Sequence, residues 1–315
     1  MRATNQHRST ARREPWPALP LEDWRDTCET LHMWTQIVGK TRLSLAPMVN
    51  HWWQVPLYVS ARGLTTSRIP HDEHGFEIEF DLVGHELTIA ADDGARWSMK
   101  LEPRSVANFY DEYMAGLHGL GLDVRIWPHP VEVQEPIPFP EDETHQSYDA
   151  AAANRFWRAL AQADRVLHEF RGRFIGKCSP VHFFWGGFDL ACTRFSGRPA
   201  PVHPGGIPNL GDWVTRESYS HECISAGWWP GTAGGPVPEP AFYAYAYPEP
   251  AGFPEAPIRP ASGKYDMTLR EWVLPYDAAR MSADPDTAVL DFLQSTYDAA
   301  ANLGGWGRQT LERTR

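Results

Sequence analysis

The sequence predicts an α+β protein built from two similar halves, each consisting of a helix, an antiparallel sheet and a second helix. Strand-like and helix-like segments occur in separate runs, which favours antiparallel sheets over a parallel α/β sheet. The same order of short motifs occurs twice, which predicts an internal duplication with pseudo-two-fold symmetry. A chain of 315 residues is long enough for this arrangement.

The repeated motifs define the two halves. They pair residues 38–40 with 175–177, 51–53 with 183–185, and 106–109 with 289–292. We expect a disordered N-terminal tail at 1–15, a first half at 16–134, a Pro-rich acidic linker at 135–147, a second half at 148–307 with a Pro/Gly-rich insertion at 198–263, and a C-terminal tail at 308–315.

In the first half, residues 21–38 place apolar side chains three and four positions apart, which predicts a helix. Gly39 is suited to end this helix. The pattern then predicts strands at 55–61, 76–82, 85–91 and 96–101. Asp93-Gly94 predicts a two-residue hairpin turn, and Ser105 is suited to cap the closing helix.

The second half is predicted to begin with a helix over 148–171 and to contain a strand over 242–247. Its last helix starts at Asp284-Pro285, an N-cap followed by proline at the first helical position. Two similar halves in one chain imitate a homodimer. We therefore expect a monomer with clefts at the interface between the halves.

The composition excludes several partners. The formal net charge of −11 argues against a nucleic-acid-binding surface and against anionic membranes. The mean hydropathy is −0.45, and no apolar run is long enough for a transmembrane helix, so we expect a cytoplasmic protein. The four cysteines form no Cys-x-x-Cys pair, which argues against a zinc ribbon.

Several motifs together resemble a bacterial family of unknown function, DUF5996, from about Trp16 onward. The motifs that carry the resemblance include Asn50-His51-Trp52-Trp53, Trp229-Pro230-Gly231 and the segment from Tyr243 to Pro248. The resemblance implies no activity, cofactor or catalytic residue. The cofactor is therefore unknown at this stage.

Two arginines occupy equivalent positions in the repeat and are each followed by hydroxyl residues. Arg62 and Arg194 could clamp an anionic ligand, because the planar guanidinium binds a carboxylate or phosphate through two parallel hydrogen bonds. The alternative is that each arginine ends a strand and pairs with a local carboxylate.

Histidines and a carboxylate lie on predicted strands among aromatic residues. His182, His221 and Glu222 could form a metal site, since imidazole nitrogen and carboxylate oxygen are suitable zinc or iron ligands. No His-Glu-x-x-His motif occurs. The alternative is that these histidines are buried and hydrogen-bonded without a functional role.

The chain contains 14 tryptophans, as many as its phenylalanines. In a pair on a strand such as Trp52-Trp53, the two side chains point to opposite faces, so large aromatic surfaces must meet another element or line a groove. An aromatic groove in an acidic protein would suit a cationic ligand. The alternative is that the indoles cover the second face of the sheet.

We therefore predict a small-molecule-binding protein with an aromatic cleft that also contains His and Arg side chains. Enzymatic activity is left open, and no catalytic residue is assigned. The candidate ligand-binding residues are Trp53, Arg62, His182, Trp185, Asp189, Arg194, His221 and Glu222. The alternatives are a metal-dependent enzyme that uses His182, His221 and Glu222, and a structural or partner-binding protein with exposed aromatic residues.

Overall fold

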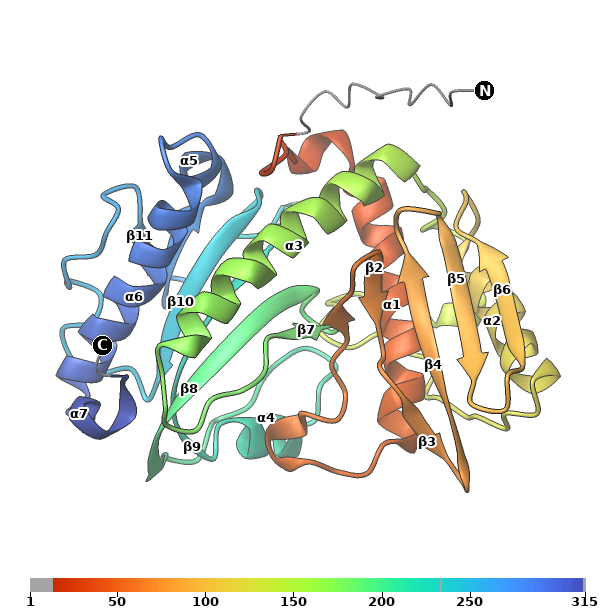
Figure 1. Cartoon of the computed structure of the whole chain (residues 1–315), viewed down its shortest axis with the longest axis horizontal. Helices are drawn as coiled ribbons and strands as arrows, with labels where there is room; N and C mark the ends of the chain where they lie inside the picture. Colours follow the sequence, from red (N-terminus) through yellow and green to blue (C-terminus); the bar gives the residue numbers. More distant parts are fainter. Residues whose placement is uncertain (1–13, 233, 314–315) are drawn as a thin grey trace, which may run out of the picture.

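The computed structural model describes residues 14–232 and 234–313 and has an α+β fold (Figure 1). Within these residues, the chain forms two six-stranded antiparallel sheets, each accompanied by helices. None of the described helices combines the length and the apolar character needed to cross a membrane. The predicted N-terminal tail lies outside the described residues up to position 13.

The first sheet has the strand order β1-β2-β4-β5-β6, with β3 also paired to β4. Helix α1 (Arg25–Leu45) precedes it and α2 (Val106–Gly119) follows it. The Ser105 hydroxyl accepts a hydrogen bond from the Asn108 backbone, so the predicted cap is confirmed. The strands are β1 (Tyr58–Val59), β2 (Gly63–Thr65), β3 (Ile69–His71), β4 (His74–Asp81), β5 (Glu86–Ala91) and β6 (Arg96–Lys100).

The second sheet has the strand order β11-β12-β10-β9-β8-β7, and the long helices α3 (Ala150–Gly172) and α6 (Pro285–Leu303) pack against its strands (Figure 1). Its strands are β7 (His182–Phe184), β8 (Asp189–Pro199), β9 (His221–Trp229), β10 (Ala241–Tyr247), β11 (Lys264–Asp266) and β12 (Glu271–Pro275). Shorter elements are η1 (Leu21–Asp23), η2 (Asn50–Trp52), η3 (Phe139–Glu141), α4 (Asp212–Ser218), α5 (Tyr276–Arg280) and α7 (Arg308–Leu311).

Both halves thus show the order helix, antiparallel sheet, helix, but an internal duplication is not confirmed. Residues 51–53 lie in and just after the 3₁₀ turn η2, whereas the paired residues 183–185 lie in and just after strand β7. The predicted insertion at 198–263 contains the whole of β9 and β10, which are central strands of the second sheet. This region is therefore part of the sheet and the core.

The prediction that Gly39 ends the first helix is wrong, because α1 continues to Leu45. A Cβ atom at Gly39 would lie 2.2 Å from Cδ1 of Trp185, so the glycine makes room for that indole. The Trp185 Nε1 donates a hydrogen bond of 2.9 Å to the Val55 carbonyl oxygen. Trp185 therefore joins the second half to two segments of the first half.

The edges of the two sheets also meet. Leu57, next to β1, exchanges two backbone hydrogen bonds of 2.9 Å with Phe183 of β7, and both side chains are fully buried. The strand predicted over 55–61 is accordingly reduced to β1. This backbone bridge fixes the position of one half relative to the other.

The predicted C-terminal tail is ordered as far as the structure describes it. Arg308 of α7 forms ion pairs of 2.6 Å with Asp298 and 2.5 Å with Glu312. The Leu311 carbonyl accepts a hydrogen bond of 2.8 Å from the Ile175 backbone. These contacts attach α7 and the residue after it to α6 and to the segment after α3. The composition of this stretch does not predict such contacts.

We predict that Gly39→Ala destabilises the protein by about 1–3 kcal/mol, because the new methyl group would force the Trp185 indole out of place. Gly119→Ala is the matched control, since a Cβ there meets nothing within 4 Å. Urea unfolding of the wild-type chain and both variants measures the differences in the free energy of unfolding. Equal stability of the two variants would contradict the role assigned to Trp185.

Candidate functional site

A cavity of about 750 Å³ lies over one face of the second sheet. Successive side chains of a strand point to opposite faces, and β8 shows the consequence. Asp189, Thr193 and Phe195 line the cavity, whereas Leu190 and Arg194 are buried on the other side. The alternation within β8 therefore separates the cavity from the hydrophobic core.

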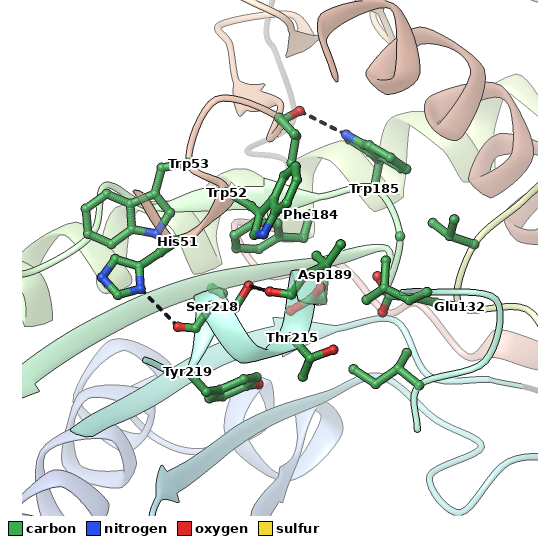
Figure 2. Close-up of a pocket in the computed structure, with 18 of the residues that line it drawn as sticks. His51, Trp52, Trp53, Glu132, Phe184, Trp185, Asp189, Thr215, Ser218 and Tyr219 are labelled. Carbon is green, nitrogen blue, oxygen red and sulfur yellow. Dashed lines mark hydrogen bonds between the residues drawn. The ribbon is translucent and has the colours of Figure 1, made fainter. Parts of the chain in front are cut away.

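Segments of both halves surround this cavity (Figure 2). The first half contributes the end of α1 and residues within the segments 51–55 and 125–132. The second half contributes the sheet, residues 207–211 and helix α4. The cavity thus lies at the junction that Trp185 and Leu57 hold together.

The wall of the cavity is strongly aromatic. Three tyrosines of the second half, Tyr219, Tyr243 and Tyr245, also line it, and the rings of Tyr243 and Tyr245 are stacked with centroids 6.1 Å apart. The lining includes six tryptophans: Trp52, Trp53, Trp127, Trp185, Trp213 and Trp229. Among these, Trp127 and Trp213 are 56% and 64% exposed, so a ligand could reach them from solvent.

Three carboxyl groups also line the cavity, and the pKa of each is raised. Burial and the nearby Asp189 charge raise the pKa of Glu132 to about 7. Burial raises the pKa of Asp189 to about 6, and burial with the Asp189 and Asp266 charges raises that of Glu271 to about 8. None of the three forms an ion pair with a basic side chain of the described residues. The cavity therefore holds carboxyl groups without a counter-charge.

Asp189 of β8 is held in place by a residue of β10, two strands away in the sheet. The Tyr243 hydroxyl of β10 reaches across β9 and donates a hydrogen bond to Asp189 Oδ2. This reach requires Gly227, because a Cβ there would lie 2.5 Å from the Tyr243 hydroxyl and 1.9 Å from the Leu190 carbonyl oxygen. The glycine in β9 therefore permits the tyrosine–aspartate contact.

The Gly186-Gly187 pair makes room for two of the carboxylates. A Cβ at Gly186 would lie 2.0 Å from Glu132 Oε1. A Cβ at Gly187 would lie 2.8 Å from Asp189 Oδ1 and 3.6 Å from Glu132 Oε2. Both carboxylates thus reach the same point next to the turn between β7 and β8.

Backbone strain is concentrated around the cavity. Nine described non-glycine residues have a left-handed φ, and four of them, His51, Trp52, Glu132 and Asn209, line the cavity. Such conformations cost roughly 1–3 kcal/mol each and persist where the surrounding structure enforces them. The His51 Nδ1 lies 3.0 Å from the Ser218 carbonyl oxygen, which ties the strained turn η2 to α4 (Figure 2).

A single lysine lines another part of the wall. Lys40 is 3% exposed, and its Nζ lies 4.9 Å from the Trp127 ring centroid and 5.5 Å from that of Trp185. Burial lowers the pKa of this amine to about 8. The two indoles stabilise the charge of Lys40 by cation–π contact.

Trp53, Trp185 and Asp189 are the predicted site residues that line the cavity. His182 lies behind Trp53, is fully buried, and neither of its ring nitrogens has a hydrogen-bond partner. Burial and the Arg42 charge lower the pKa of His182 to about 3. His182 is therefore a neutral histidine packed among aromatic rings, and it does not line the cavity.

The two arginines of the predicted clamp do not come together. Arg194 is 1% exposed and packs against the Phe170 ring, 3.5 Å from its centroid, on the core face of the sheet. Burial lowers the pKa of Arg194 to about 10. Arg62 is at the surface and donates to Asp81 at 2.7 Å, which is the local ion pair of the alternative interpretation.

The proposed metal ligands are also separate from the cavity. His221 is exposed, and Glu222 accepts from Arg198 at 2.8 Å. Within the described part of the chain, no group of three His, Cys, Asp or Glu side chains is arranged to hold a metal ion. The combination of His182, His221 and Glu222 is therefore not supported by the geometry.

Three residues of the cavity lining, Glu132, Glu271 and Lys40, were not predicted from the sequence. Glu132 lies in an irregular segment at the end of the first half, and Glu271 begins a short strand, so neither carries a local signal. Tyr243 and Tyr245 are two positions apart in the sequence, and β10 places both rings on the cavity face.

The fold and the cavity define an α+β protein with an aromatic, carboxyl-containing cavity at the junction of two antiparallel sheets. A family model matches residues 16–313, and the chain belongs to this family, which is described as a family of unknown function (DUF5996). No curated protein gives a significant match to the chain, and neither does any solved structure.

We predict that Glu271→Gln stabilises the protein at pH 8 by about 1 kcal/mol or more and has little effect near pH 4. The folded-state pKa of Glu271 is raised from 4.5 to about 8, so the unfolded chain releases its proton first, and the stability of the protonated form is lost as the pH rises from about 4.5 to about 8. Thermal unfolding at the two pH values tests this, with Glu73→Gln at an exposed turn as the control. A stability gain that does not depend on pH would contradict the prediction.

Proposed function

We propose that this protein binds a small organic molecule in the cavity over the second sheet. The observation that carries the proposal is the lining, in which six tryptophans and three carboxyl groups surround about 750 Å³. Ligand sites typically enclose roughly 300–1,000 Å³ and combine apolar and aromatic walls with a few polar groups. Trp53, Trp185 and Asp189 are the site residues of the sequence analysis that belong to this proposal.

The energetics of the cavity support the same proposal. Strained backbone at His51 and Trp52 and carboxyls with raised pKa values both lower the stability of the unliganded fold. Features that lower stability are expected at functional sites, where the function compensates for the lost stability. Binding of a ligand to the folded state offsets the cost.

An enzymatic role is the second candidate, and one observation favours it. The pKa values of Asp189 and Glu132, about 6 and 7, are suited to proton transfer near neutral pH. The Tyr243 hydroxyl would position the Asp189 carboxylate for such a step.

We predict that 1-aminoanthracene, a neutral fluorophore that responds to polarity, binds the full chain with a 1:1 saturable signal. Trp213→Ala should weaken this binding about threefold to tenfold, because the exposed indole contributes aromatic contact at the cavity. Met267→Ala, an exposed apolar residue that does not line the cavity, should leave the binding unchanged. Fluorescence titration measures the affinity of the wild-type chain and of both variants for 1-aminoanthracene.

Absence of saturable binding to the folded wild-type chain would contradict the proposal. It would favour the alternative in which the exposed aromatic residues form a contact surface for a partner protein. An equal loss of affinity in Trp213→Ala and Met267→Ala would place the fluorophore outside the cavity.

A further inference from the structure

We infer that the ligand of this cavity carries an organic ammonium group, which binds where Asp189, Glu132 and Glu271 face the cavity. The inference rests on the proposed function, because it specifies the chemical class of the molecule bound at the same site. It follows from the position of the carboxyl groups, an unpartnered hydroxyl and the aromatic wall.

All three carboxyl groups line the cavity, and two of them lie close together. Glu132 and Asp189 both border Gly187, at the distances given above. The Asp189 charge acts on both Glu132 and Glu271, so Asp189 is the group that the other two share. A cation among them would relieve this repulsion and receive charge-assisted hydrogen bonds.

A buried hydroxyl at the same site has no partner. Thr215 of α4 is 2% exposed and lines the cavity, yet its Oγ1 makes no hydrogen bond within the described residues. A threonine in a helix commonly bonds to a carbonyl of the preceding turn. Figure 2 shows Thr215 below Asp189 and Glu132 in that view. Its oxygen can accept from an ammonium N–H.

Electron-rich rings border the carboxyl groups. Tyr243 donates to Asp189, Tyr245 stacks on Tyr243, and the Tyr219 and Tyr245 hydroxyls lie 2.8 Å apart. Trp229, at the end of β9, lines the cavity as well. The faces of such rings attract cations, so the wall and the carboxylates favour the same ligand charge.

The protein does not fill this position with a cation of its own. The two basic side chains of the lining are Lys40, which lies over Trp127 and Trp185, and the exposed Arg125. Neither forms an ion pair with any of the three carboxyl groups. The carboxyl groups are also not arranged as a metal site in the described chain. An organic cation is the ligand that matches both facts.

The test uses three probes with a phenylethyl skeleton and different charge. Phenethylammonium is the cation, 2-phenylethanol is neutral, and 3-phenylpropanoate is the anion. Each displaces 1-aminoanthracene from the full wild-type chain at pH 8, where Asp189 and Glu132 are largely ionised. We expect phenethylammonium to bind at least tenfold more tightly than the alcohol, and the anion to bind most weakly.

The same displacement is repeated on the double variant Asp189→Asn and Glu271→Gln, with Glu73→Gln as the surface control. The amides keep the shape of the carboxyl groups and remove their charge. We expect the preference for the cation to fall below threefold in the double variant and to persist in Glu73→Gln. Retained 1-aminoanthracene binding shows that the double variant is folded. If the double variant does not fold, Thr215→Val replaces it. This variant should weaken the binding of phenethylammonium more than the binding of 2-phenylethanol.

The outcomes separate the two proposals. If 1-aminoanthracene binds but phenethylammonium has no advantage over 2-phenylethanol, the ammonium inference is overturned and the proposed function stands. A cation preference that survives in the double variant also overturns the inference, because neither Asp189, which the other two carboxyl groups share, nor Glu271 would be its cause. If neither the fluorophore nor any probe binds, the proposed function itself fails.

Discussion

The cavity depends on one side chain, the Trp185 indole, which connects the two halves of the molecule. It occupies the space left by Gly39 in the middle of α1 and donates to the Val55 carbonyl oxygen. The backbone bridge between Leu57 and Phe183 lies close by in sequence and joins the two sheets. Together these contacts hold the segments of the first half over the exposed face of the second sheet. Without them, the face that carries Asp189 would be open to solvent.

The two faces of the second sheet have different surroundings. Its inward face packs against α3 and α6 and buries residues such as Leu190, Trp228 and Phe242. Its other face carries Asp189, Tyr243 and further polar and aromatic groups into the cavity. Because the stability of the fold comes from the inward face, the cavity face can keep features that lower stability, including raised pKa values and strained backbone. Arg194 and Asp189, both candidates from the sequence, are separated by this alternation.

The sequence predicted the fold class and most helices because these features depend on local patterns. The cap at Ser105, the helix start at Asp284-Pro285 and the strand over 242–247 all follow from neighbouring residues. The end of α1 could not be predicted, since Gly39 is kept by a contact with Trp185 from the other half. Glu132 and Glu271 were missed for the same reason, because only the folded chain brings them to the same cavity as Asp189.

Membership of a family of unknown function leaves the chemistry of this cavity as the guide to what the protein does. A crystal structure of the full chain grown with phenethylammonium chloride tests the central claim most directly. The account predicts the phenyl ring among the cavity aromatics and the ammonium nitrogen within hydrogen-bond distance of Asp189 and of Glu132 or Glu271. An ammonium group turned away from these carboxylates, or a ligand bound only outside the cavity, would contradict it.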